Sequence, residues 1–192
     1  MVIVVVNRDA VSTALASYFA AAPDRRLDAV PLLSALCQED DVVSRSTFPL
    51  HVTCSAAVVD AVGDVLMVRH RWLGAWRLPG GHVEPHDQSM YEAALRELEA
   101  ETGTCWHHTA SAEPDEVVPV DVHIHSVPAD GTRNEPSHVH ADFRYAFSAG
   151  GFEMFTSVKK GTAFAWRPPL DLPAPRFTFS AYGIWANGSI PY

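Results

Sequence analysis

Residues 78–103 read Leu-Pro-Gly-Gly-His-Val-Glu-Pro-His-Asp-Gln-Ser-Met-Tyr-Glu-Ala-Ala-Leu-Arg-Glu-Leu-Glu-Ala-Glu-Thr-Gly, and this stretch decides the fold. Its first part is a loop around Pro79-Gly80-Gly81, whose bare backbone lets a ligand or a metal approach closely. Its second part predicts a helix from about Ser89 to Thr102, with Gly103 just past the C-terminus. We therefore expect a glycine-rich loop that leads directly into a helix.

Two carboxylates mark one face of this predicted helix. Glu97 and Glu101 are one turn apart, so both side chains project in the same direction. Oxygen ligands on a rigid helix suit a hard divalent cation, Mg2+ or Mn2+. An Mg2+ ion with so few carboxylate ligands keeps several waters and takes further oxygens from substrate phosphates. The pattern predicts a magnesium site that serves phosphate chemistry.

The stretch resembles the Nudix box, the signature Gly-x5-Glu-x7-Arg-Glu-(apolar)-x-Glu-Glu-x-Gly-(apolar). The residues that match it are Gly81, Arg96, Glu97, Leu98, Glu101 and Gly103. The resemblance implies an α/β fold, a Nudix-like α/β/α sandwich with a mixed sheet. It also implies a hydrolase that cleaves a phosphoanhydride in a small nucleoside-diphosphate-type or related phosphorylated compound, with magnesium held by the helix glutamates.

The resemblance assigns roles to particular residues. Glu97 and Glu101 are expected to bind the metal, Arg96 to orient the carboxylates, and Glu84 to act as a further ligand or a base. Gly80 and Gly81 are expected to lie against the substrate, with the Gly80 carbonyl assisting the metal. The candidate catalytic residues are therefore Glu97, Glu101, Arg96 and Glu84.

Three departures from the box are visible. Counting forward from Gly81, the loop acid is Asp87 rather than glutamate, and the loop is one residue longer than the signature allows. A surface loop absorbs one extra residue at little cost. Ala100 takes the first position of the expected Glu-Glu pair, and Glu99 lies on the far side of an ideal helix. The box therefore offers two helix carboxylates where the family usually has three.

Four arginines outside the box are candidates for contact with substrate phosphates, namely Arg69, Arg71, Arg77 and Arg144. The alternative is that these cations cover the surface or pair with the excess of acids.

Two predicted strands concentrate metal-binding side chains. Residues 120–128 alternate, which places Asp121, His123 and His125 on one face. Residues 137–145 alternate again and place four polar residues on one face: His138, His140, Asp142 and Arg144. Two such strands joined by a loop would pair and collect four histidines and two aspartates on one surface. The pattern resembles that of a bacterial branch of Nudix proteins with a His-rich strand pair.

The histidines admit two interpretations. One is a second site for a transition metal, for the non-phosphate half of a substrate or for a general base, formed by His123, His125, His138, His140 and Asp142. The other is a set of polar strand residues that hydrogen-bond one another. Imidazole is a better ligand for a transition metal than for Mg2+, so the chain could hold two chemically distinct metal sites.

The rest of the chain predicts few chemical features. Two helices are expected before the box, one with a buried face from Ala10 to Phe19 and one over residues 27–38 with Leu27, Val30, Leu33 and Leu36 as its apolar side. A hairpin over residues 52–60 and 64–70, and a strand over 162–168, are expected around it. The aromatic residues Phe177, Phe179, Tyr182 and Trp185 would wall a pocket, close the core edge or form an oligomer contact.

Length and composition bound the class of protein. A chain of 192 residues with 47% hydrophobic and 19% charged residues is expected to form a soluble domain, divided into a helical extension (1–46) and a Nudix-like domain with an aromatic-rich tail (47–192). A net charge of −9 argues against a nucleic-acid polymer as partner and leaves a small phosphorylated substrate. A second copy of the chain, in a homodimer, is a further candidate partner.

Cysteine usage and the first residues bear on the compartment. Cys37, Cys54 and Cys105 are odd in number and widely spaced, which favours reduced thiols in a cytoplasmic protein. The opening residues 1–6 are apolar, but they lack a basic start and are too few for the apolar span of a signal peptide or a membrane anchor, so neither is expected.

Two rival functions remain open at this level. In the first, the box is a degraded scaffold, and a transition metal on the histidine surface serves another reaction. In the second, the fold is a non-catalytic ligand-binding module. Metal analysis, and substitution of Glu97, would separate them from magnesium-dependent hydrolysis.

Overall fold

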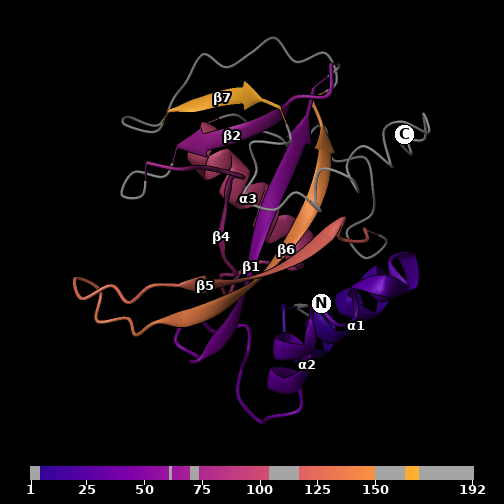
Figure 1. The fold of residues 1–192 in the computed structure, drawn as a ribbon, viewed down its shortest axis with the longest axis vertical. Helices are drawn as coiled ribbons and strands as arrows, with labels where there is room; N and C mark the ends of the chain where they lie inside the picture. The colour runs from indigo at the N-terminus through magenta and orange to yellow at the C-terminus, as the bar shows by residue number, and fades with distance from the viewer. Residues whose placement is uncertain (1–4, 61, 70–73, 104–116, 150–162, 169–192) are drawn as a thin grey trace.

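The computed structural model describes residues 5–60, 62–69, 74–103, 117–149 and 163–168 (Figure 1). Three α-helices and a short 3-10 helix lie in these ranges: α1 (Arg8–Ala21), η1 (Pro23–Arg25), α2 (Val30–Leu36) and α3 (Met90–Thr102). Seven strands form the sheet: β1 (Leu50–Val59), β2 (Val65–Arg69), β3 (Trp76–Arg77), β4 (Gly80–His82), β5 (Asp121–Val127), β6 (His138–Ser148) and β7 (Phe164–Arg167). Arg71, Cys105 and the aromatic residues Phe177, Phe179, Tyr182 and Trp185 lie outside the described ranges.

The sheet is mixed and is built around β1. Its strand order is β3-β2-β1-β6-β5, with β4 also paired to β1 and β7 paired to β2. β6 runs parallel to β1 over ten residue pairs, from Leu50 beside Val139 to Val59 beside Ser148. β5, β4 and β2 pair antiparallel to their neighbours. One long strand therefore connects the box to the histidine-rich strands.

The predicted hairpin at the end of β1 is confirmed. Val59 pairs with Val65, and Gly63 takes the positive φ of 92° that a tight turn requires. The Asp60 carboxylate accepts hydrogen bonds from the backbone amides of Val62 and Asp64, at 2.9 Å each. The predicted C-terminal strand is present as β7.

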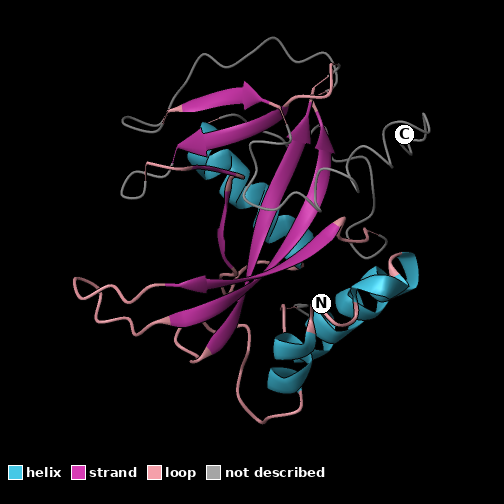
Figure 2. Cartoon of the chain, in the orientation of Figure 1, coloured by secondary structure: helices cyan, strands magenta, loops and turns pink. Residues whose placement is uncertain are grey.

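The two faces of β1 differ in chemistry because successive side chains alternate. On one face, Cys54, Ala56 and Val58 join a core with α3 and the N-terminal helices. On the other, Ala57 and Val59 form a smaller cluster with β2 residues, and polar residues take the positions before them. Figure 2 shows α3 behind the sheet and α1 and α2 beside its lower end.

The N-terminal helices share the main core. Asn7 caps α1 by accepting a hydrogen bond from the Ala10 amide, and α1 buries Val11, Leu15, Tyr18 and Phe19 as its pattern predicts. The backbone of β1 is tied to the segment after α2, because the Val52 amide donates to the Val42 carbonyl at 2.8 Å. The division at residue 46 remains a prediction.

The predicted second helix needs correction. It is shorter than residues 27–38, and its buried side is Leu32 with Ala29, whereas Leu27, Val30 and Leu33 are exposed. Pro31 occupies the first turn, so α2 begins only at Val30 and the preceding residues turn away from its axis. The predicted apolar face was therefore placed on the wrong side. None of the helices in the described ranges combines the length and the apolar composition that a membrane crossing requires.

Candidate functional site

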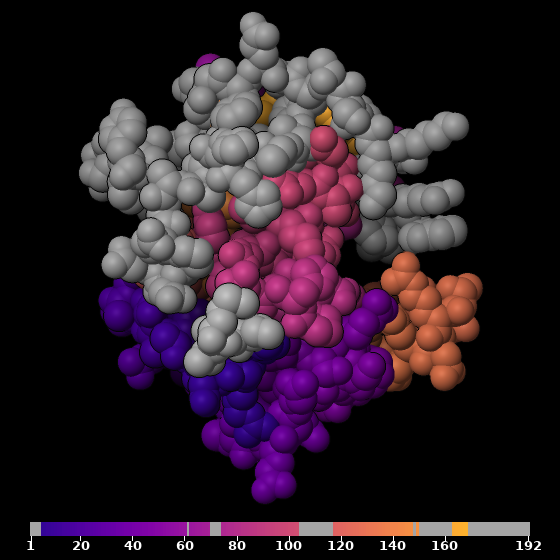
Figure 3. Space-filling model, turned by 180° about the vertical axis from the view of Figure 1, so that it is seen from behind, coloured from indigo at the N-terminus to yellow at the C-terminus, as the bar shows by residue number. Residues whose placement is uncertain are grey.

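The ends of α3 are fixed by local sequence. Ser89 caps the N-terminus by accepting a hydrogen bond from the Glu92 amide at 3.1 Å, and the Glu92 carboxylate accepts one from the Gln88 amide. Gly103 closes the C-terminus in the left-handed conformation, with φ 74°. The predicted helix is confirmed, and its caps set which residues face the loop before it. Figure 3 shows the pink surface of α3 on the back of the molecule.

Arg96 fastens the helix to the preceding loop. Its Nε and Nη2 donate to the two carboxylate oxygens of Asp87 at 2.8 and 2.9 Å, its Nη1 donates to Glu97 at 2.7 Å, and its Nη2 also donates to the His82 carbonyl at 2.8 Å. Asp87 is 3% exposed and also accepts from the Glu84 amide at 2.7 Å. The longer loop therefore still delivers its acid to the arginine, and aspartate replaces glutamate in that contact.

Glu97 lies directly against the glycine loop. A Cβ placed on Gly81 would stand 2.6 Å from the Glu97 carboxylate carbon and 2.7 and 2.8 Å from its two oxygens. Any side chain at this position would displace the carboxylate. The glycine is required here for the close approach of the Glu97 carboxylate rather than for a turn, whereas the sequence had suggested the approach of a ligand or a metal.

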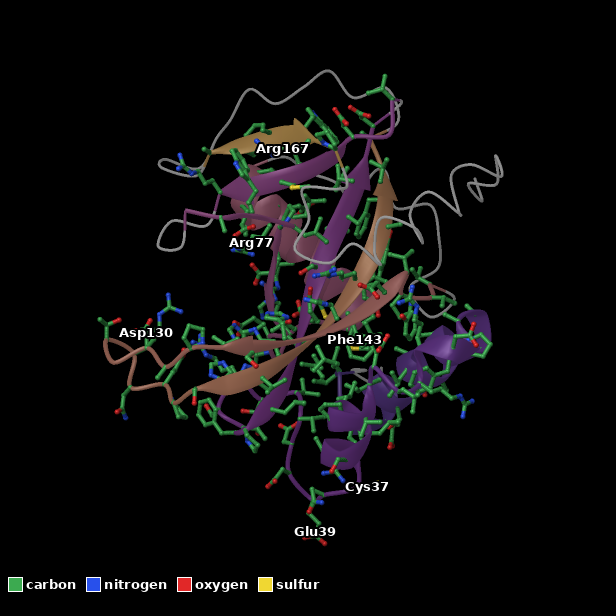
Figure 4. All side chains as sticks on the ribbon, viewed as in Figure 1. Cys37, Glu39, Arg77, Asp130, Phe143 and Arg167 are labelled. Carbon is green, nitrogen blue, oxygen red and sulfur yellow. The ribbon has the colours of Figure 1, made fainter. Side chains whose placement is uncertain are left out.

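Glu101 lies one turn further along, beside the Gly80 backbone. Arg77 Nη2 donates to its Oε1 at 2.6 Å, while Arg77 Nη1 donates to the Gly80 carbonyl at 3.0 Å. Burial raises the pKa of the Glu101 carboxyl, and the Arg77 charge opposes that rise. Its second oxygen, Oε2, is buried without a hydrogen-bond partner among the described residues. Figure 4 shows Arg77 beside α3.

The remaining predicted residues have different surroundings. Ala100 is exposed on α3, so the third family carboxylate is absent from an open position. Glu84 is partly exposed next to Asp87. Arg69 donates from Nε to the Gly74 carbonyl at 3.2 Å. Arg144 is 5% exposed and pairs with Asp121 at 3.2 Å and Asp142 at 3.1 Å, which argues against direct contact with a substrate phosphate.

The two histidine-rich strands pair as predicted. In the register of β5 and β6, His123 lies beside Asp142 and His125 beside His140. The parallel pairing of β1 adds a histidine that the sequence reading omitted, because His51 lies beside His140. β4 adds a second, because His82 pairs with Thr53 on the same face. Five histidines thus gather on one face of the sheet, namely His51, His82, His125, His138 and His140, with His123 stacked on His125.

Asp142 is held inside this face by other groups. Its oxygens accept from the hydroxyls of Thr53 at 3.1 Å and Ser55 at 2.8 Å, and from Arg144 Nε at 3.1 Å. Burial alone would raise the pKa of Asp142, but the Arg144 charge and these hydrogen bonds lower it. These contacts occupy the carboxylate that was predicted as a ligand of the second site.

The sequence profile of the NUDIX domain matches residues 49–182. The chain belongs to this family. A relative in Lactococcus lactis subsp. cremoris (strain MG1363), a probable DHNTP pyrophosphohydrolase, is 31% identical over 91 residues, 47% of this chain and 50% of the relative. The chain therefore spans about half the length of this curated relative. The Nudix resemblance and the predicted α/β fold are both confirmed.

Solved structures with a similar chain trace include two described here. The E. coli dihydroneopterin triphosphate pyrophosphohydrolase is 13% identical, with 71% of this chain and 95% of that one covered and a TM-score of 0.47. The NUDIX domain of Shewanella oneidensis NrtR, solved with ADP ribose, is 18% identical, with 79% and 96% covered and a TM-score of 0.42.

In this Nudix chain, five histidines of β1, β4, β5 and β6 have a lowered pKa. Burial is the largest cause in each case, and it lowers the pKa of His82 and His123 to about 4 and that of His140 to about 3. Burial also lowers the pKa of His51 and His125. Neutral imidazoles are the form that binds metals.

His51 and His82 were not predicted as members of the histidine face, and the sequence carries a signal for only one of them. His51 belongs to an alternation with Thr53 and Ser55 that marks one polar face of β1, so the same period-two test would have found it. His82 follows the glycines in a three-residue strand, which is too short for any periodicity to be read. Its position emerges only from pairing with β1.

Proposed function

We propose that this Nudix-family chain is a metal-dependent hydrolase that cleaves a phosphoanhydride in a small nucleoside-diphosphate-type or related phosphorylated compound. The observation that supports this most is the box geometry, in which Arg96 binds both Asp87 and Glu97 while Glu97 lies against Gly81. The arrangement holds an acid in a defined place beside a chain segment that a phosphate can approach.

The residues present fit a hard divalent cation. Glu101 offers a buried oxygen without a hydrogen-bond partner among the described residues, and Glu97 offers a carboxylate one turn away. An all-oxygen donor set of this kind suits Mg2+ or Mn2+. Glu97 and Glu101 would hold the ion, with the Gly80 carbonyl beside them. When bound, the ion would polarise a phosphoryl oxygen and lower the pKa of an attacking water.

The other residues of the box act on these two carboxylates. Arg96 neutralises and orients Glu97, and Asp87 fixes Arg96 in turn. Arg77 holds Glu101 and the Gly80 carbonyl, so it positions the site from the side of β3. Glu84 remains a candidate for a further ligand or a base, because its partly exposed side chain belongs to the same loop.

The substrate class is inferred from the family and the relative. The Lactococcus relative is a probable DHNTP pyrophosphohydrolase, which places a heterocyclic nucleoside-type triphosphate among the first compounds to test. We propose cytoplasmic nucleotides and related phosphorylated metabolites as the partners, without a nucleic-acid polymer or a membrane.

The test is a hydrolysis screen with protein that has been freed of metal by a chelator. Nucleoside triphosphates, dihydroneopterin triphosphate and dinucleoside polyphosphates are tried as substrates, first without metal and then with added Mg2+ or Mn2+. We expect release of pyrophosphate or phosphate only with metal, and its loss in Glu97→Gln and Glu101→Gln. Gln replaces each carboxylate at equal size, so folding should be retained. Turnover that survives both substitutions would exclude this site as the source of activity.

A non-catalytic ligand-binding module is the alternative that the missing carboxylate at Ala100 favours. It predicts saturable binding of a phosphorylated compound with no turnover under any metal. Binding measured by calorimetry in parallel with product release distinguishes the two functions.

A further inference from the structure

Three histidines on the polar face of the sheet converge more closely than the rest. One ring nitrogen from each of His51, His138 and His140 lies within 4.8 Å of the other two. They come from β1 and from alternate positions of β6, which pair in parallel and hold the three rings on one side. This cluster lies on the face of β1 opposite α3, so it is separate from the carboxylates of the box.

The outward nitrogens of two of these rings have fixed partners. His51 Nδ1 lies 3.0 Å from the Thr47 carbonyl, and His138 Nδ1 lies 2.8 Å from the Pro136 carbonyl. A carbonyl only accepts, so both Nδ1 atoms carry the proton and both Nε2 atoms present a lone pair. A ring nitrogen that donates to a carbonyl while the other faces inward is the usual arrangement of a metal-bound histidine.

The inward nitrogens lack enough donors. His51 is 1% exposed, and its Nε2 has no hydrogen-bond partner in the described part of the protein. His138 Nε2 lies 3.0 Å from His140 Nε2, a contact that one proton can satisfy for that pair alone. A buried lone pair without a donor is costly, and a cation supplied from outside would satisfy all three.

We propose that His51, His138 and His140 bind a divalent transition-metal ion of the Zn2+ class, at a site distinct from the oxygen site on α3. Three imidazole ligands suit Zn2+, Co2+ or Ni2+ and do not suit Mg2+. Zn–N bonds of about 2.0–2.1 Å place ligand nitrogens about 3.3 Å apart in a tetrahedron, so the widest pair of rings needs to close by at most ~1.5 Å.

The surroundings define what the site leaves open. His82 and His125 have ring centroids 5.3 and 5.4 Å from that of His140, so further imidazoles border the cluster. Three protein ligands leave a fourth position for a ligand from outside these three residues. Asp142 does not contribute, because Thr53, Ser55 and Arg144 occupy its oxygens.

The experiment uses the full chain, stripped with a chelator and titrated with Co2+, whose visible absorption reports nitrogen ligands in a four-coordinate site. We expect one equivalent to bind in a large excess of Mg2+, to be displaced by Zn2+, and to raise the melting temperature. His51→Gln and His140→Gln should each weaken binding by about 100-fold or more. His86→Gln is the matched control, because the His86 side chain is 70% exposed and lies outside the cluster.

Two outcomes would overturn the proposal. One is the absence of a Co2+ absorption band in the folded wild-type protein. The other is equal Co2+ affinity in wild type and in both cluster variants, which would place the metal elsewhere. The variant Glu97→Gln/Glu101→Gln should bind Co2+ at this site as wild type does, so failure of the hydrolase proposal and failure of this one are separable. Because His140 is partly exposed, its variant remains informative even if loss of His51 prevents folding.

Discussion

Replacing Gly81 by alanine is the sharpest perturbation of the box, because it moves one carboxylate and little else. The added Cβ would stand 2.6 Å from the Glu97 carboxylate carbon, whereas carbon atoms in contact prefer about 3.5–4.0 Å. The carboxylate must therefore retreat by ~1 Å. A misplacement of about 1 Å in a catalytic group costs about 100-fold in rate.

Folding should be affected much less than activity. Glu97 is the flexible end of a partly exposed side chain, and Gly81 has no positive φ that alanine would strain. The change in the free energy of unfolding should stay within about 1 kcal/mol. At Gly80, by contrast, a Cβ would meet Ser55 Oγ, the Cys54 carbonyl at 2.6 Å and the Ser55 Cα at 2.8 Å, so Gly80→Ala must displace backbone and should destabilise the protein.

The assay measures kcat for metal-dependent product release together with the melting temperature. Gly131→Ala is the control, because a Cβ there has no atom within 4 Å. The double variant Gly81→Ala/Glu97→Asp, one methylene shorter, should regain part of the lost rate. If Gly81→Ala keeps the wild-type kcat at saturating Mg2+, Glu97 does not act from the position described and the reasoning is wrong.

Three further predictions concern the box helix, the Arg96 ion pair and the buried histidines. Ala100→Glu adds a carboxylate at an exposed helix position, so the free energy of unfolding should change by less than about 0.5 kcal/mol. The Mg2+ affinity, measured from the metal dependence of turnover, should rise. An unchanged metal dependence would contradict this prediction. Asp87→Asn weakens the bidentate contact with Arg96 and should lower the free energy of unfolding in urea by about 2 kcal/mol, the value of a hydrogen bond to a charged group. An unchanged midpoint would show that this pair does not stabilise the fold. Burial lowers the pKa of His82 from 6.5 to about 4 and that of His140 to about 3. Between these values and 6.5 the unfolded chain binds more protons than the folded chain, so stability falls as the pH drops through this window. The loss is at most about 1.4 kcal/mol per pH unit for each ring. Urea unfolding at pH 7 and pH 5 measures this, and a smaller loss in His82→Gln would assign it.

The sequence predicted the box well because its information is local. The spacing of Glu97 and Glu101 follows from the helix period, and the caps Ser89 and Gly103 lie at the ends of the same segment. The extra loop residue was correctly expected to be tolerated, but the contact of Asp87 with Arg96 was found only in the structure. Local spacing therefore sufficed for both the acids and the residue that orients them.

The histidine site was predicted only in part because it depends on distant pairing. Alternation identified the faces of β5 and β6, but the Ser55–Asp142 contact joins residues 87 positions apart and follows from a parallel pairing that no local signal specifies. The periodicity of residues 27–38 also misled, because it placed the apolar side on Leu27, Val30, Leu33 and Leu36, whereas the helix begins only at Val30, with Pro31 in its first turn, and buries Leu32.

His82 has a consequence for how this protein can change over evolution. Its carbonyl accepts from Arg96 at 2.8 Å, while its imidazole faces the opposite side of β4, with its ring centroid 5.1 Å from that of His51. The residue His82 thus connects the carboxylate site of the box with the histidine cluster. A backbone shift in β4 that changes the geometry of one site must also move the other, so the ligand specificities of the two sites should change together in evolution.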